Sequence, residues 1–254
     1  MTMHKRENAE RIEPADRTEP LGFRPLYAQV KAIFIRRLAD GVWAPGAGLP
    51  SEGQLAAEIG VSQGTVRKAL DELAAENLLV RRQGRGTFVA EHDERRILFQ
   101  FFKLVPDDGV ARFPDSTVLS VVVALADAGE RQALDLSPGD DVIRIRRVRA
   151  LDGAPLVLET VSLPRRLFGG IEAGPVPNNL YSLYGARYGV TVANAREKLK
   201  AVALSAGEAA LLAVAPGTPA LQVDRLALSL DGAPVERRLS LCLTEGAHYL
   251  SDLR

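Results

Sequence analysis

Apolar residues recur every three or four positions across residues 25–80, and this spacing is typical of amphipathic helices. The pattern predicts three short helices, one that begins at Pro25 and two that follow Ser51 and Ser62. Proline is tolerated in a first helical turn because its missing N–H would be unbonded there anyway. Ser51 and Gln54 have the spacing of a capping box, and Ser62 is a favourable N-cap.

Two short strands are expected after the third helix, at residues 79–82 and 87–90. The turn between them contains Gly84 and Gly86, which supply the positive φ values that a tight hairpin needs. Three helices followed by a glycine-tipped hairpin are the elements of a winged helix-turn-helix. In that arrangement the third helix enters a DNA groove and the hairpin lies beside it.

The rest of the chain has strand-like alternation with occasional helical stretches, and it contains a weak internal repeat. Residues 133–163 match residues 210–241 with one residue of slippage. Each copy reads as the end of a helix, a Pro-Gly turn, a strand, an Asp-Gly turn and a second strand, which predicts a hairpin. Two hairpins suggest one antiparallel sheet with helices packed on one face, and the likeliest helices are at residues 180–190 and 205–214. The fold class is therefore α+β.

A chain of 254 residues is long enough for two domains, and a hydrophobic content of 46% can fill their cores. We expect a disordered tail at residues 1–20 and a DNA-binding domain at residues 21–90. A short charged linker is expected at residues 91–96, and a second domain at residues 97–254.

Charge and cysteine usage narrow the class of protein. The net charge is zero, but residues 21–90 contain nine Lys/Arg against six Asp/Glu, and a small basic surplus fits contact with phosphates. Cys242 is the only cysteine, so no intrachain disulfide is possible, which fits a reducing cytoplasm. No apolar run approaches the roughly 20 residues that span a bilayer, so we expect a cytoplasmic protein without a membrane partner.

The N-terminal end of the third helix has a polar and basic outer face. Arg67 can bond guanine through two hydrogen bonds, and Gln63 can pair with adenine. Ser62 and Thr65 suit a phosphate, which the dipole at a helix N-terminus also favours. Arg85 at the hairpin tip could enter a minor groove. The predicted DNA-binding residues are Ser51, Ser62, Gln63, Gly64, Thr65, Arg67, Lys68, Gln83, Gly84, Arg85 and Gly86.

Four motifs occur in order along this region, and they read PLY, LPSE, GVSQGTVRKAL and QGRGTFV. With these motifs, residues 25–89 resemble the winged helix-turn-helix of the GntR family of bacterial transcription regulators. The resemblance implies binding to a double-stranded operator. GntR modules often carry arginine where this chain has Gly53 and Gln63, and this departure predicts a weaker grip on phosphate or an altered operator.

The phrases LDGAPLVLETVSLP and NLYSLYGARYGVTVANAREKLKAV carry a second, looser resemblance. They are similar to the ligand-binding domain of the HutC subfamily, called UTRA. The resemblance implies a sheet like that of chorismate lyase, a small cytoplasmic metabolite as effector, and a dimer in which the effector signal reaches the DNA-binding modules.

One predicted strand carries charge on an apolar face. Residues 142–150 place Ile143, Ile145, Arg147 and Arg149 on the same side. Arginines there must be paired or used, and Glu159 on the next strand is a plausible partner. An ion pair that only ties two strands together is the alternative to a ligand site. The resemblance implies these effector-binding residues: Arg147, Arg149, Glu159, Asn179, Tyr181, Glu236 and Cys242.

The sequence thus predicts a repressor that is a homodimer on an inverted-repeat operator and is released by a small anionic metabolite. We expect Arg147 and Arg149 to hold a carboxylate or phosphate, because the guanidinium fork bonds either group bidentately. A ligand-modulated activator is one alternative. A lyase-like enzyme is another, but no nucleophile–base pair or metal-ligand cluster supports it, so no catalytic residue, metal or cofactor is expected.

Overall fold

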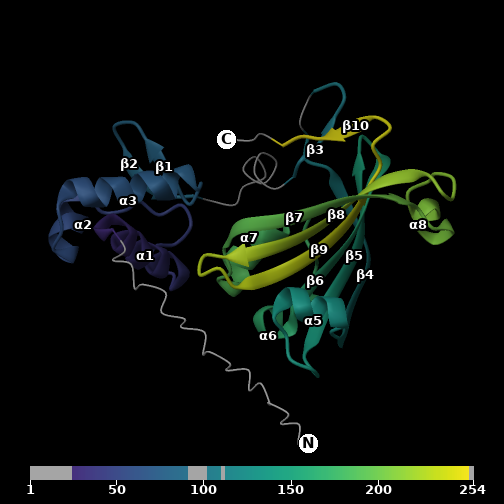
Figure 1. Ribbon diagram of the computed structural model, residues 1–254, viewed down its shortest axis with the longest axis horizontal. Coiled ribbons are helices and arrows are strands. Elements are labelled where there is room, and N and C mark those ends of the chain that lie inside the picture. Colours follow the sequence, from purple (N-terminus) through teal and green to yellow (C-terminus); the bar gives the residue numbers. More distant parts are fainter. Residues whose placement is uncertain (1–24, 91–101, 110–111, 252–254) are drawn as a thin grey trace, which may run out of the picture.

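The computed structural model describes residues 25–90, 102–109 and 112–251. The tail predicted at residues 1–20 and the linker predicted at residues 91–96 lie outside the described residues. Figure 1 shows a small helical module on one side and a larger curved sheet on the other. Within the described ranges, no helix is long and apolar enough to cross a membrane.

The N-terminal module has the predicted order of three helices and a hairpin. Its elements are α1 (Leu26–Ala39), α2 (Glu52–Ile59), α3 (Gln63–Ala75), β1 (Leu79–Arg82) and β2 (Gly86–Val89). The apolar stripes of the helices meet in one core, where Phe34, Leu55 and Leu70 are at most 1% exposed. Burial of these stripes holds the outer face of α3 in a fixed orientation, since short helices are marginal without packing.

Local caps define where the helices begin. Ser51 Oγ accepts a hydrogen bond from the Gln54 backbone N–H at 3.3 Å, and the Gln54 side chain accepts one from the Ser51 N–H at 2.9 Å. Ser62 Oγ caps α3 by accepting from the Thr65 N–H at 3.2 Å. Gly60 ends α2 with a φ of 77°, where a side chain would be strained. The predicted caps are confirmed.

The C-terminal part contains a six-stranded antiparallel sheet in the order β4-β5-β6-β9-β8-β7. The strands are β4 (Asp115–Leu125), β5 (Asp141–Leu151), β6 (Ala154–Pro164), β7 (Val192–Ala203), β8 (Pro219–Ser229) and β9 (Pro234–Cys242). The two repeat copies form the hairpins β5–β6 and β8–β9, as predicted. Because β6 pairs with β9, the copies lie side by side in the middle of the sheet.

Helices cover both faces of the sheet, so the prediction of helices on one face is wrong. Phe168 and Tyr184 of α6 and α7 pack on the face that carries Ile143 and Ile145. Ala209 of α8 packs on the opposite face. Amphipathic periodicity indicates that a helix needs a partner but not which face it covers. The helices of this part are α5 (Ala128–Leu134), α6 (Arg165–Phe168), a 3-10 turn (Ile171–Ala173), α7 (Leu180–Tyr188) and α8 (Ala206–Leu211).

A separate two-stranded sheet, β3 (Leu104–Pro106) with β10 (Ala247–Tyr249), completes the fold. Leu104 and Ala247 pack on Val157 and Val223 of the large sheet. This places β3 and β10 on the same face as α6 and α7, toward the other end of the strands. The part of that face between the two coverings carries the arginines.

Candidate functional site

The outer face of α3 presents the predicted DNA-binding residues to solvent. Gln63, Gly64, Arg67 and Lys68 are exposed, while the opposite stripe of the helix is buried. The Lys68 ammonium lies 3.9 Å from the centre of the Tyr27 ring, which ties the PLY motif to the recognition helix.

The hairpin tip is exposed beside α3, as a DNA-binding wing requires. Gly84 and Gly86 have φ values of 69° and 107°, so both positions need the freedom of glycine. Gln83 and Arg85 are exposed with them. Arg82 lies over the Phe88 ring at 4.7 Å. The wing therefore offers backbone N–H groups and guanidinium groups on one surface.

A carboxylate that the sequence interpretation missed lies at the centre of this surface. Glu52 Oε2 accepts from Arg67 Nε at 2.9 Å, and Glu52 Oε1 accepts from Arg81 Nη1 at 3.1 Å. Arg81 also contacts Asp71 at 2.5 Å. The hydrogen bond from Arg67 is the main cause that lowers the pKa of Glu52. Glu52 thus links α2, the recognition helix and the wing.

The two departures from the GntR pattern are neighbours in space. A Cβ atom on Gly53 would lie only 2.8 Å from Nε2 of Gln63. The absence of a side chain at position 53 therefore leaves the space that the Gln63 amide occupies. Both residues, with Glu52 and Gln83, line a groove between α2, α3 and the wing.

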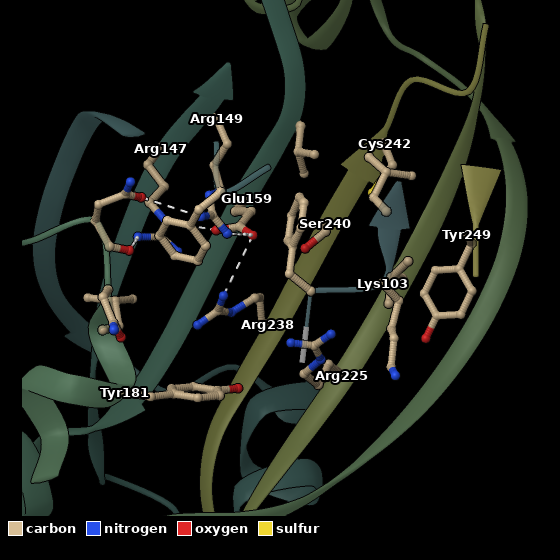
Figure 2. A pocket seen from close by; sticks show the side chains of 18 residues that line it. Lys103, Arg147, Arg149, Glu159, Tyr181, Arg225, Arg238, Ser240, Cys242 and Tyr249 are labelled. Atoms are coloured by element: carbon tan, nitrogen blue, oxygen red, sulfur yellow. Dashed lines mark hydrogen bonds and ion pairs between the residues drawn. The ribbon is translucent and has the colours of Figure 1, made fainter. Parts of the chain in front are cut away.

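A pocket opens on the arginine face of the large sheet, and Figure 2 shows its lining. Four arginines from three strands point into it: Arg147, Arg149, Arg225 and Arg238. Aromatic rings and aliphatic groups from β3, β10 and α7 enclose them. The predicted residues Glu159, Asn179, Tyr181 and Cys242 also line the pocket.

Glu159 is the central acid of the pocket. Its carboxylate lies 2.7 Å from Arg147 Nε, 3.6 Å from Arg238 Nη1 and 3.7 Å from Arg149 Nη1. It is 2% exposed. Burial alone would raise the pKa of Glu159, but the charges of Arg147, Arg238 and Arg149 hold it well below its usual range. Glu159 is therefore ionised at neutral pH.

Arg149 is the least compensated of the arginines. Its guanidinium lies between the Phe102 and Phe113 rings, at 4.9 and 4.8 Å from their centres. Nη2 donates to the oxygens of Pro114 and Asn178, both at 3.3 Å, whereas Nε is buried and has no partner among the described residues. Burial lowers the pKa of Arg149 to about 9, which still leaves the group charged at neutral pH. An unmade hydrogen bond at a buried cation is costly.

Arg147 is more fully engaged. Its Nε bonds Glu159, and Nη1 donates to the carbonyl oxygen of Asn178 at 3.0 Å. The ion pair that the sequence left as an alternative is therefore present, and it forms part of the pocket wall. Asn179 is likewise both a lining residue and the N-cap of α7, since it accepts from the Ser182 N–H at 3.0 Å.

Glu236 does not line the pocket, although it was predicted to contact the effector. It is fully buried and accepts hydrogen bonds from Arg238, Tyr181 and Tyr184. These contacts place Glu236 behind the wall, where it holds Arg238. Cys242 is buried in the wall, and burial raises the pKa of its thiol to about 12, so it stays protonated.

The second hairpin supplies residues that the sequence interpretation missed. Arg225 faces Arg238 across β8 and β9, just as Arg147 faces Glu159 across β5 and β6. Arg225 bonds Glu197 through Nε at 2.6 Å. The remaining missed lining residues include Phe102, Lys103, Phe113, Asn178, Ser240 and Tyr249.

Comparison with known proteins agrees with both halves of this description. Residues 26–89 match the family described as bacterial regulatory proteins, gntR family, and residues 111–247 match the UTRA domain. The chain belongs to the GntR family. Its combination of the two domains places it in the HutC subfamily.

Named relatives are regulators of the same kind. A histidine utilization repressor of Pseudomonas putida is 37% identical over 139 residues, 54% of this chain and 56% of the relative. The repressor NagR of Bacillus subtilis is 28% identical and covers 90% of this chain and 96% of its own. The solved ligand-binding domain of a GntR-family regulator from Bordetella bronchiseptica is 36% identical with a TM-score of 0.55, over 60% of this chain and 96% of that one.

The chain is therefore a transcription regulator rather than an enzyme. The N-terminal module of this GntR protein binds DNA, and its UTRA domain binds an effector. In the described ranges, no group of three His, Cys, Asp or Glu residues is arranged to hold a metal ion.

Proposed function

We propose that this regulator is a repressor that binds an inverted-repeat operator as a homodimer and leaves it when a small anion fills the arginine pocket. The names of the Pseudomonas putida and Bacillus subtilis relatives, both called repressors, support the sign of regulation. It would act in the cytoplasm, where operator DNA is found.

The buried guanidinium of Arg149 is the observation that carries the anion. Its Nε donor has no partner among the described residues, and its side chain is 2% exposed. An oxyanion beside Arg149 would accept this hydrogen bond and offset the charge. Arg147, with two donors already engaged, acts mainly by positioning Glu159. The sequence analysis expected both Arg147 and Arg149 to hold the anion, whereas we assign that role to Arg149 and a positioning role to Arg147.

The charge of the pocket also favours an anion. Its four arginines are offset by three carboxylates, which leaves a surplus of one positive charge among these seven groups (4 − 3 = 1), and Lys103 also lines the pocket. The carboxylates are Glu159, Glu197 and Glu236. A carboxylate or a phosphate fits this surplus equally well, since a guanidinium fork bonds both.

For operator binding we propose the predicted residues of α3 and the wing. Arg67 and Gln63 would read base edges, while Ser62, Thr65 and the glycines of the wing would approach phosphates. Arg67 would do so with Glu52 still bonded to its Nε and Nη2, because the Arg67 side chain is 62% exposed.

The free edge of the sheet supports the homodimer. β4 has a strand neighbour on one side only, and Val122 and Leu125 on it are 47% and 67% exposed. Asp115 is its one charged residue, whereas the opposite edge strand β7 carries several charges that protect it from pairing. We propose that two copies pair along β4 about a two-fold axis.

The test uses duplexes that the wild-type protein selects from a random pool. Binding is measured by fluorescence anisotropy, with and without pools of small phosphates and carboxylates. We expect one pool to release wild-type protein but not Arg149→Met, which keeps its DNA affinity. Arg146→Met is the matched control, because Arg146 is on the same strand but exposed. A normal response in Arg149→Met would contradict the proposed site.

A further inference from the structure

The hydrophobic core of the DNA-binding module extends into the UTRA domain. Ala193 of β7 is 4% exposed and belongs to the same buried cluster as Phe34 and Leu70. Leu230, in the turn between β8 and β9, packs against this cluster. The two domains are therefore in apolar contact as well as joined by the chain.

Trp43 takes part in this contact. A small cavity between the domains is lined by Trp43 and other apolar residues of the module on one side, and by Thr191 and Leu230 on the other. Trp43 is 8% exposed, with its ring 5.3 Å from that of Phe34. Burying apolar surface at about 25 cal/mol per Å² makes such a contact stabilising.

The β8–β9 hairpin carries both Leu230, which contacts the DNA-binding module, and two arginines of the pocket. Arg225 is on β8 and Arg238 is on β9, and both side chains line the pocket. Leu230 follows Arg225 by five residues, a span of about 17 Å at about 3.3 Å per residue. β8 and β9 are paired by backbone hydrogen bonds over nearly their whole length, so we expect the hairpin to move as one unit.

We propose that Leu230 is a latch through which the effector pocket controls the position of the DNA-binding module. This rests on the proposed function. An anion that draws Arg225 and Arg238 toward it changes the position of the β8–β9 turn and thereby the docking of Trp43. A ligand shifts such an equilibrium only by its different affinity for the two states, and the hairpin supplies that difference. A module freed from the latch still binds DNA but no longer responds to the effector.

Trp43 is the only tryptophan of the chain, so its fluorescence reports on the latch without labelling. We expect Leu230→Asp to move Trp43 emission to longer wavelength, toward that of an indole in water, and to abolish release from operator. Leu230→Met keeps an apolar contact and should retain wild-type emission. Leu151→Asp is the matched control, since Leu151 starts the corresponding Leu-Asp-Gly turn of the first hairpin. Wild-type emission in Leu230→Asp would overturn the latch, whether or not any anion binds.

A second measurement separates the latch from the pocket. Inorganic phosphate and acetate are each titrated into wild type and Arg149→Met, with thermal stability and Trp43 emission recorded together. We expect the anion that stabilises wild type but not Arg149→Met to shift Trp43 emission in wild type and to leave Leu230→Asp unchanged. Stabilisation of wild type with no change in Trp43 emission would overturn the latch and leave the pocket standing.

Discussion

Replacing Glu159 by glutamine removes one negative charge from the centre of the arginine cluster. The amide keeps the shape of the side chain and can still accept from Arg147 Nε. It no longer offsets the charges of Arg238 and Arg149, which lie 3.6 and 3.7 Å from the carboxylate. All three arginines are at most 7% exposed, so water cannot replace the lost charge.

The expected cost is large because the site is buried. Removal of one partner from a buried ion pair typically costs about 3–5 kcal/mol, since the remaining charge stays desolvated. A domain of 150–250 residues loses about 2–4 °C of melting temperature per kcal/mol, so the UTRA domain of Glu159→Gln should melt about 6–20 °C lower. The DNA-binding module should keep its stability.

Urea unfolding followed by circular dichroism measures this loss. Glu58→Gln is the control, because Glu58 forms an exposed ion pair with Arg37 at 2.7 Å. Such surface pairs contribute about 0–1 kcal/mol. A loss below about 1 kcal/mol in Glu159→Gln, the size of a surface pair, would refute the view that Glu159 holds the cluster together.

Four further outcomes can be measured. Glu52→Gln removes a negative charge from the DNA-facing surface, so its affinity for scrambled DNA in an anisotropy titration should rise roughly fivefold, the equivalent of about 1 kcal/mol at 4 Å in water. The folded-state pKa of Glu159 is depressed, so its contribution to stability is complete above the unfolded value of about 4.3 and is lost as pH falls below it. Urea unfolding at pH 7 and pH 3 should therefore show a smaller loss of stability in Glu159→Gln than in wild type, because other carboxylates with a lowered pKa, such as Glu130, remain. Val122→Lys places charge on the free edge of β4 and should give monomers by analytical ultracentrifugation. Gly53→Arg should displace Gln63 and change the duplexes selected from a random pool, without loss of folding by circular dichroism.

Features that depend on neighbouring residues in the chain could be predicted from the sequence. The capping box of Ser51 and the cap at Ser62 are satisfied within one turn, so their side chains carry the signal directly. The two hairpins were predictable from their Asp-Gly turns for the same reason. Period-two spacing also placed Arg147 and Arg149 on one face, and both are buried there.

Features set by contacts between distant segments could not be read in this way. Arg147 and Arg149 look alike in a strand pattern, yet one bonds Glu159 while the other lies between Phe102 and Phe113. The packing of these two rings, which flank β3 in the chain, distinguishes them. Glu236 matched a pocket position, but two tyrosines of α7 draw it behind the wall.

The internal repeat also indicates how charge is distributed in the pocket, because its two copies differ at the residue that faces the arginine of the first strand. Arg147 and Arg225 occupy equivalent places, and each faces a residue of its own hairpin partner strand. In the first copy that residue is Glu159, so the pair is neutral. In the second copy it is Arg238, so two positive charges meet, and carboxylates outside the repeat pairing, Glu197 and Glu236, must offset them. The exchange of an acid for a base in the second copy therefore brings Arg225 and Arg238 together on the hairpin that contacts the DNA-binding module, where Glu197 and Glu236 offset them. The surplus positive charge is that of Arg149 on the first hairpin, which is where an anion would be held.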